Sequence, residues 1–154
     1  DTMKYNNTLS SDRFALASAV LDTLHGAGFT LVPANRLPSR TREDVYEREV
    51  TRSGRGRIVV QVWTSIEGGY MRSAGKDAIR VATVFINDNG TQRGCAKERR
   101  VNRTGDINAI AERMLGRMRD AWRGVKTIER CGSCGSPEFT SKKKNTVCAA
   151  LCWK

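Results

Sequence analysis

The stretch RIVVQVWTSI at residues 57–66 is the strongest strand signal in the chain, because β-branched residues dominate it. Alternation along this stretch separates two faces of a predicted strand. The face expected to meet helices carries Ile58, Val60, Val62, Thr64 and Ile66. The opposite face carries Arg57, Val59, Gln61, Trp63 and Ser65.

Four further strands and two helices are expected around this stretch. Strand patterns cover residues 29–32, 45–51, 78–86 and 91–101, with turn signals at residues 53–56 and 87–90. One helix is expected from Ser10 or Ser11 to about His25, after a frayed start, and a second from Thr104 or Asp106 to about Arg123. The expected apolar stripes are Phe14, Ala17, Leu21 and Leu24 in the first helix, and Ile107, Ile110, Met114, Met118 and Trp122 in the second. This order predicts an α+β fold, in which an antiparallel β-meander packs with N- and C-terminal helices.

The charge of the chain is strongly one-sided. The 154 residues include 27 Lys and Arg against 16 Asp and Glu, which gives a net charge of +11. Residues 1–90 carry 12 cations and 10 anions, whereas residues 91–154 carry 15 cations and six anions. Such a surface attracts phosphates, so we expect nucleic acid as partner, with a solvated basic surface as the alternative. No membrane contact is expected, because no apolar run approaches the roughly 20 residues of a membrane helix.

Four of the five cysteines lie at the C-terminal end, as Cys131-Gly-Ser-Cys134 and Cys148-Ala-Ala-Leu-Cys152. The thirteen residues between the pairs suit a small hairpin, and two such pairs can surround one tetrahedral Zn²⁺ ion. Two disulfides are the alternative, which an oxidising compartment would favour; no secretory signal is visible. The favoured interpretation is a structural Zn²⁺ site in a cytoplasmic or nucleoid-associated protein. Cys95 stands apart and is interpreted as a small buried residue.

The segment Cys131-Gly-Ser-Cys134-Gly-Ser-Pro137, a basic hairpin and the second cysteine pair resemble the C4 zinc ribbon at the C-termini of type IA topoisomerases. The resemblance covers about residues 129–154. It departs from the family's pattern in the second pair, which has three intervening residues and no aromatic-proline segment. In that family such ribbons bind DNA, preferentially single-stranded. The resemblance implies a C-terminal zinc ribbon, to which we assign residues 127–154. The strand and helix patterns of residues 1–126 indicate a separate, basic α+β domain, which we expect to bind nucleic acid.

The strand face that carries Trp63 is a candidate surface for single-stranded nucleic acid. The arginines expected to share it are Arg48, Arg57 and Arg80. Arginines can then meet phosphates while the tryptophan ring stacks on bases. The alternative places Trp63 in a core beneath a second layer, because apolar side chains lie on the same face.

Two further groups of cations are candidate phosphate contacts. The first precedes the second helix, whose N-terminal amides also favour phosphate, and comprises Lys97, Arg99, Arg100 and Arg103. Its alternative is a charged edge strand that prevents aggregation. The second lies at the tip of the cysteine hairpin and comprises Lys142, Lys143 and Lys144, with Trp153 nearby. A polar turn and a small aromatic core are the alternatives there.

No catalytic constellation is recognisable, since P-loop, G-x-S-x-G and H-E-x-x-H motifs are all missing from the sequence. The sequence therefore predicts a non-enzymatic protein that binds single-stranded DNA, in replication, recombination or strand annealing, a role compatible with homo-oligomers. A metal-dependent nuclease using Glu67 and Asp77 is the runner-up. An RNA-binding module and a protein-interaction adaptor that uses the ribbon are the remaining alternatives.

Overall fold

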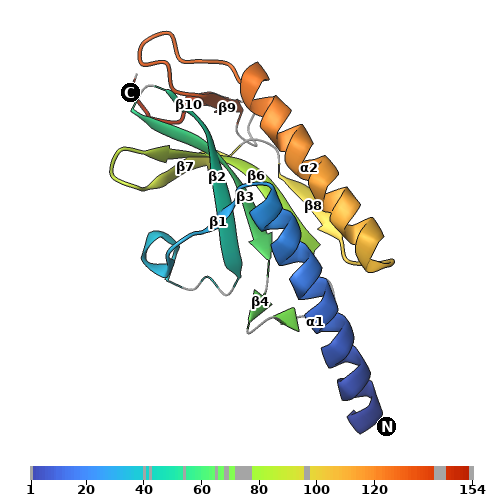
Figure 1. The fold of residues 1–154 in the computed structure, drawn as a ribbon. Coiled ribbons are helices and arrows are strands. Elements are labelled where there is room, and N and C mark those ends of the chain that lie inside the picture. Colours follow the sequence, from blue (N-terminus) through green and yellow to red (C-terminus); the bar gives the residue numbers. More distant parts are fainter. Residues whose placement is uncertain are drawn as a thin grey trace.

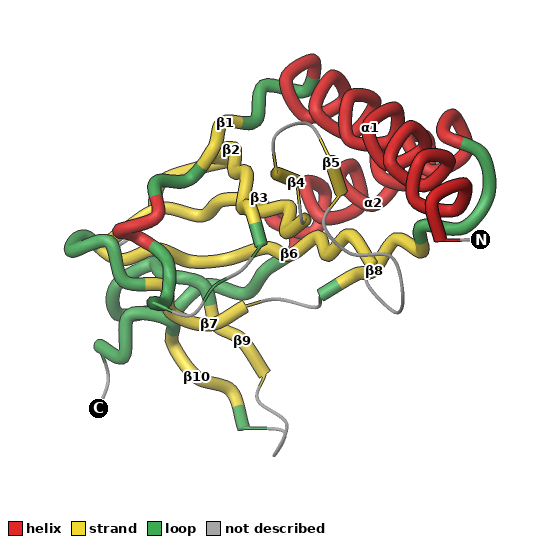
Figure 2. The backbone as a smooth tube through the Cα atoms, turned by 90° about the horizontal axis from the view of Figure 1, so that it is seen from below, coloured by secondary structure: helices red, strands yellow, loops and turns green. Residues whose placement is uncertain are grey.

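The computed structural model describes residues 2–39, 41, 43–53, 55–64, 66–67, 70–71, 78–95, 98–140 and 145–152. An antiparallel sheet carries two helices, α1 (Thr2–Gly26) and α2 (Ile107–Thr127), on one face (Figure 1). Figure 2 shows both helices on the same side of the sheet, and we call the opposite side the open face. The predicted α+β class with an antiparallel sheet is confirmed. None of the helices in the described part of the chain is long and apolar enough to cross a membrane.

The main sheet has the strand order β1-β2-β3-β6-β7, and β8 also pairs with β6. Its strands are β1 (Thr30–Leu31), β2 (Asp44–Ser53), β3 (Gly56–Thr64), β6 (Ala78–Asn87), β7 (Gln92–Cys95) and β8 (Arg99–Asn102). Two short hairpins lie outside it, β4 (Ile66–Glu67) with β5 (Tyr70–Met71), and β9 (Glu138–Thr140) with β10 (Thr146–Cys148). A 3₁₀ turn at Ala34–Arg36 joins β1 to β2.

Both predicted turns are confirmed, but the strand expected at residues 91–101 is replaced by two shorter strands. Ser53 pairs with Gly56 across the β2–β3 turn, and Gly90 takes a φ of 87° after β6. The pattern at residues 91–101 forms two strands, β7 and β8. Gly94 takes a left-handed φ of 63° within β7 and bulges out between Arg93 and Cys95, which pair with consecutive residues of β6. β8 then pairs with the first half of β6, while β7 pairs with its second half.

The helices cover the sheet face that the alternation predicted. Val60 and Val62 of β3 and Ile79 and Val81 of β6 form the main core with both helices. The buried residues of α2 are Ile110, Met114, Met118, Ala121 and Val125. Asp106 caps this helix by accepting a hydrogen bond from the Ala109 amide at 2.8 Å.

The first helix differs from its prediction in length and in its buried stripe. It begins at Thr2 instead of Ser10 or Ser11. Among its side chains from Phe14 onward, which are the ones the structure describes, Ala17, Val20 and Leu24 are buried, whereas Phe14 is 49% exposed. The reason is that α1 projects past the sheet towards its N-terminus, so only its C-terminal half has strands to cover (Figure 1).

The cysteine-rich segment packs against the sheet instead of standing apart from it. Ile58, Phe85 and Val125 form a second buried cluster with Ala149, and Phe139 packs on this cluster. Phe139 of β9 also lies over Gly94 of β7, where an added Cβ would be 2.3 Å from a ring carbon. Apolar contacts therefore tie the hairpin β9–β10 to one end of the main sheet.

Replacing Gly94 with alanine is expected to loosen this contact. Both Gly94 and Gly90 have positive φ, but a Cβ at Gly90 would meet nothing within 4 Å. Gly90→Ala should therefore cost about 1 kcal/mol from backbone strain alone. Gly94→Ala should cost roughly 1–3 kcal/mol more, because the methyl group displaces Phe139. Urea denaturation compares the two variants, and equal losses of stability would contradict the contact.

Candidate functional site

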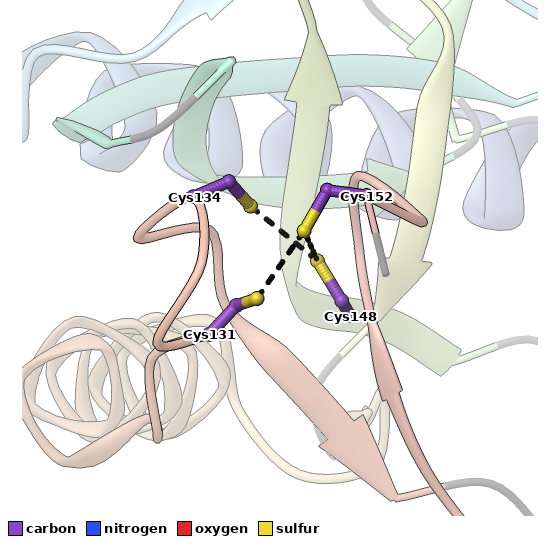
Figure 3. Close-up of side chains that lie close together, drawn as sticks. All are labelled: Cys131, Cys134, Cys148 and Cys152. Carbon is purple, nitrogen blue, oxygen red and sulfur yellow. Dashed lines mark hydrogen bonds between the residues drawn. The ribbon is translucent and has the colours of Figure 1, made fainter. Parts of the chain in front are cut away.

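Four cysteine sulfurs converge between the turn before β9 and the turn after β10 (Figure 3). The Sγ atoms of Cys131 and Cys152 are 3.3 Å apart, those of Cys134 and Cys148 3.6 Å, and those of Cys148 and Cys152 3.7 Å. Zn–S bonds of about 2.3 Å in a tetrahedron separate the sulfurs by about 3.8 Å. All four are free cysteines, and the predicted cluster is confirmed as a group that could hold a metal ion.

Two tight turns aim the cysteines at one another. In the first, the Gly135 amide donates to the Cys131 carbonyl and the Cys131 amide donates to the Ser136 carbonyl, both at 2.8 Å. Gly135 takes a φ of 75°, which favours glycine. In the second, the Leu151 amide donates to the Cys148 carbonyl at 2.9 Å, so that Cys152 turns back towards the end of β10.

The same turns favour thiolates at the first cysteine pair. The pKa of Cys134 is lowered to about 6, first by the Ser136 hydroxyl and then by the Ser136 amide. Ser136 is fully buried. The backbone amides of Cys134 and Ser133 lower the pKa of Cys131, although burial opposes them. Hydrogen bonds to Cys134 and Cys131, together with burial, raise the pKa of Cys152. Thiolates are the metal-binding form of cysteine, so the first pair is prepared for a cation.

On the open face, a polar network centres on Glu47 of β2. Arg36 donates to both carboxylate oxygens of Glu47 at 2.8 Å, and Arg57 donates to one of them at 3.1 Å. Gln61, which is fully buried, donates to the other oxygen at 3.2 Å. Burial would raise the pKa of Glu47, but the hydrogen bonds from Arg36 and Gln61 outweigh it, and the pKa is lowered. Glu47 therefore stays ionised and holds Arg36, Arg57 and Gln61 in place.

The network continues to Trp63. The Trp63 indole N–H donates to the Gln61 side-chain oxygen at 3.1 Å, and Gln61 donates to Gln92 at 2.6 Å. Arg80 lies over the Trp63 ring at 5.0 Å from its centroid and pairs with Glu43 at 3.3 Å. The ring and the guanidinium are thereby fixed relative to one another.

Beside this pair the open face is hollowed. We call the hollow the Trp63 hollow; it measures about 360 Å³ and is lined by Trp63, Arg80, Ala82, Val84, Gln92, Gly94 and Glu98. Its apolar floor, Ala82 and Val84, belongs to a buried cluster that also includes Val59 and Ile86. Trp63 itself is only half-buried, so part of the ring borders the hollow.

The structure does not bring Arg48 to this face, which corrects the predicted grouping. Arg48 pairs with Val60 across the hairpin and therefore lies on the helix face. There its guanidinium sits 4.2 Å from the Trp122 ring centroid and donates to the Ala27 carbonyl at 2.8 Å. A bulge between Glu49 and Thr51 shifts the register, so that Arg48 and Arg57 lie on opposite faces of the sheet. Arg57, Trp63 and Arg80 do share the open face.

The other predicted contacts lie elsewhere or outside the described residues. Arg99 and Arg100 belong to β8, an edge strand of the described sheet, and Arg103 follows it before α2. Arg100 is exposed and pairs with Glu98 at 3.3 Å. The positions that fall outside the described residues are Lys97, Lys142, Lys143, Lys144, Trp153 and Asp77, together with the side chain of Glu67.

No protein-family model matches the chain, and comparison with curated proteins and with solved structures finds no match either. The likeness to topoisomerase ribbons therefore rests on the cysteine segment alone. In that segment the structure supports a cluster of four cysteines that could hold a metal ion.

Sequence reasoning missed Glu47, Gln92 and Trp122 as parts of these sites. Counting back from the β2–β3 turn without the bulge places Glu47 opposite Val62 on the helix face, so no sequence signal indicates that Glu47 pairs with Gln61. Gln92 comes close to Gln61 because β7 folds back along β6 after the predicted turn at residues 87–90, but the turn signal alone does not give the contact between the two side chains. Trp122 fits the apolar stripe of α2, and nothing in the sequence indicates that Arg48 lies over it.

Proposed function

We propose that this protein binds nucleic acid, with single-stranded DNA favoured, and that a structural Zn²⁺ ion holds its C-terminal hairpin. The observation that carries the proposal is the Trp63 hollow. It combines a fixed Arg–Trp pair with Gln92 and Glu98, whose side chains can donate to and accept from a base edge. Its volume of about 360 Å³ is that of a small-ligand site.

Two kinds of group would bind the strand: cationic side chains and the Arg80–Trp63 pair. The net charge of +11 attracts the phosphate backbone and makes affinity fall as salt rises. A base entering the hollow stacks on Trp63 or on the Arg80 guanidinium, each such contact contributing about 1–3 kcal/mol. A duplex keeps its bases stacked inside, so single strands are preferred. A preference for single-stranded DNA suits a role in replication, recombination or strand annealing.

A direct test uses fluorescence anisotropy with a labelled single-stranded DNA, its duplex and the matching RNA, over a salt series with Mg²⁺ present. We expect Trp63→Leu, which keeps apolar volume and removes the ring, to weaken single-strand binding about tenfold. The salt dependence should stay unchanged, because no cation is lost.

The matched control for charge is Arg93→Gln, a change at an exposed cation of β7 that is not among the described residues lining the Trp63 hollow. It should lower the salt dependence and affect all three ligands alike. Equal, weak binding to all three ligands, unaffected by Trp63→Leu, would contradict the proposal and leave only nonspecific attraction. Cleavage of the oligonucleotide in Mg²⁺ would support the nuclease alternative instead.

A further inference from the structure

A second hollow lies on the helix face, between α2 and the segment that joins α1 to β1. Its floor is apolar and consists of Phe29, Leu115, Met118 and Trp122. Three arginines border it, Arg48 from β2 and Arg119 and Arg123 from α2. We call this site the Trp122 groove; its volume is about 300 Å³. The helices that flank it lie side by side in both views of the fold (Figures 1 and 2).

The arginines of the groove differ in how they are held. Arg48 is fixed by the Trp122 ring and by the Ala27 carbonyl. Arg119 and Arg123 are exposed, and no ion pair joins either of them to a carboxylate within the described ranges. Their positive charge is therefore available to a ligand that settles on the apolar floor.

The hydrogen-bonding groups of the groove limit the chemical class of ligand that it can bind. The described lining side chains are apolar or donate hydrogen bonds, and none of them offers an acceptor. A nucleobase edge carries donors as well as acceptors, and the Trp63 hollow serves both kinds through Gln92 and Glu98. The Trp122 groove suits instead a ligand with carboxylates around an apolar side chain. It also lies on the other side of the sheet from the Trp63 hollow, so the two sites do not compete for space.

We propose that the Trp122 groove docks an acidic, amphipathic segment of a partner protein. An apolar side chain of that segment packs against Leu115, Met118 and Trp122, and flanking carboxylates pair with Arg119 and Arg123. Arginine and tryptophan are the residues most often found to dominate such interfaces. The protein can then bind a partner on its helix face independently of any nucleic acid on its open face.

The test uses a short fluorescein-labelled peptide that alternates aspartates with leucine and phenylalanine, measured by anisotropy at physiological salt. We expect the intact chain to bind it with a dissociation constant in the micromolar range. Arg119→Glu should weaken binding at least tenfold, and Leu115→Ser should weaken it about fivefold. The matched control is Arg117→Glu, an exposed arginine of α2 that borders a different hollow with Arg113 and Asp120. This variant has the same net charge as Arg119→Glu and should change binding less than twofold.

Two peptide controls complete the experiment. Exchanging the apolar residues for serine, or the aspartates for lysine, should abolish binding. Equal losses in Arg119→Glu and Arg117→Glu would reduce the effect to overall charge and overturn the proposal. A second result would also overturn the proposal: a single-stranded oligonucleotide displaces the peptide from the wild-type chain, and the Arg119→Glu variant no longer binds that oligonucleotide. The groove would then be a nucleic-acid site. Trp63→Leu should leave peptide binding intact, so the two proposals fail separately.

Discussion

Replacing Cys148 with serine is expected to abolish metal binding and to unfold the hairpin β9–β10, while most of the sheet stays folded. Cys148 is fully buried and its sulfur lies within 4 Å of both Cys134 and Cys152. Serine is a poor Zn²⁺ ligand, and three remaining sulfurs leave one corner of the tetrahedron open. Structural zinc sites of this kind supply the folding free energy of their own segment, about 10–16 kcal/mol in small peptides.

The effect on the rest of the chain should be smaller but measurable. Phe139 and Ala149 cover Ile58, Phe85 and Val125, and an unfolded hairpin leaves these three side chains to water. Losing such apolar packing typically costs about 2–4 kcal/mol. The main core contains none of the hairpin's residues, so it should survive. We therefore expect the sheet to melt at a lower temperature than before, as a separate transition.

Metal content, circular dichroism and amide hydrogen exchange measure these outcomes together. The wild-type chain should hold a single Zn²⁺ ion and protect the amides of residues 145–152, whereas Cys148→Ser should lose both. Ser133→Ala, a change at an exposed residue between the first two cysteines, is the matched control and should keep both. A metal-free wild-type chain with two disulfides would contradict the zinc assignment. A variant whose sheet loses its circular dichroism signal and its amide protection together with the hairpin would contradict the division at residue 127.

The strands and the cysteine cluster were predictable because local patterns determine them. Alternation at residues 57–64 and the turns at residues 53–56 and 87–90 require only near neighbours in sequence. The spacing of Cys131, Cys134, Cys148 and Cys152 is also a local pattern on each side of one hairpin. Inward and outward faces of β3 followed directly, as the cores on its two sides show.

The grouping of the arginines was less predictable, because single-residue events decide it. Val50 is an extra, bulged residue in β2. Because of it, side chains before Val50 point to the sheet face opposite to the one that an unbroken alternation from the β2–β3 turn would give. That shift separates Arg48 from Arg57 and places it against Trp122. The left-handed Gly94 similarly forms a bulge in β7 and lines the Trp63 hollow. Such events follow from tertiary packing, which propensity alone does not reveal.

Replacing Glu47 with glutamine is expected to destabilise the fold by about 3 kcal/mol, because it removes the only negative charge in contact with Arg36 among the described groups and the nearer of the two in contact with Arg57, which also pairs with Glu49 at 4.0 Å. The Glu47 side chain is 8% exposed, and the two arginines are 25% and 23% exposed, so water compensates them only in part. Glutamine also turns one oxygen into a donor that faces Gln61 and Arg36. The second expected effect is looser positioning of Gln61 and hence of Trp63, which would weaken single-strand binding.

Glu49→Gln is the matched control, since Glu49 lies on the same strand, is 36% exposed and pairs with Arg52 at 3.0 Å. An exposed pair of this kind contributes less than about 1 kcal/mol. The pH dependence of the free energy of unfolding distinguishes Glu47→Gln from Glu49→Gln further. Because the pKa of Glu47 is lowered on folding, its contribution is complete above about pH 5 and is lost as pH falls through the depressed value. The stability gap between wild type and Glu47→Gln should thus be constant near neutrality and close in acid, as urea titrations at successive pH values would show. A gap that does not change with pH, or one no larger than that of Glu49→Gln, would mean that the arginines do not depend on this carboxylate for their charge balance.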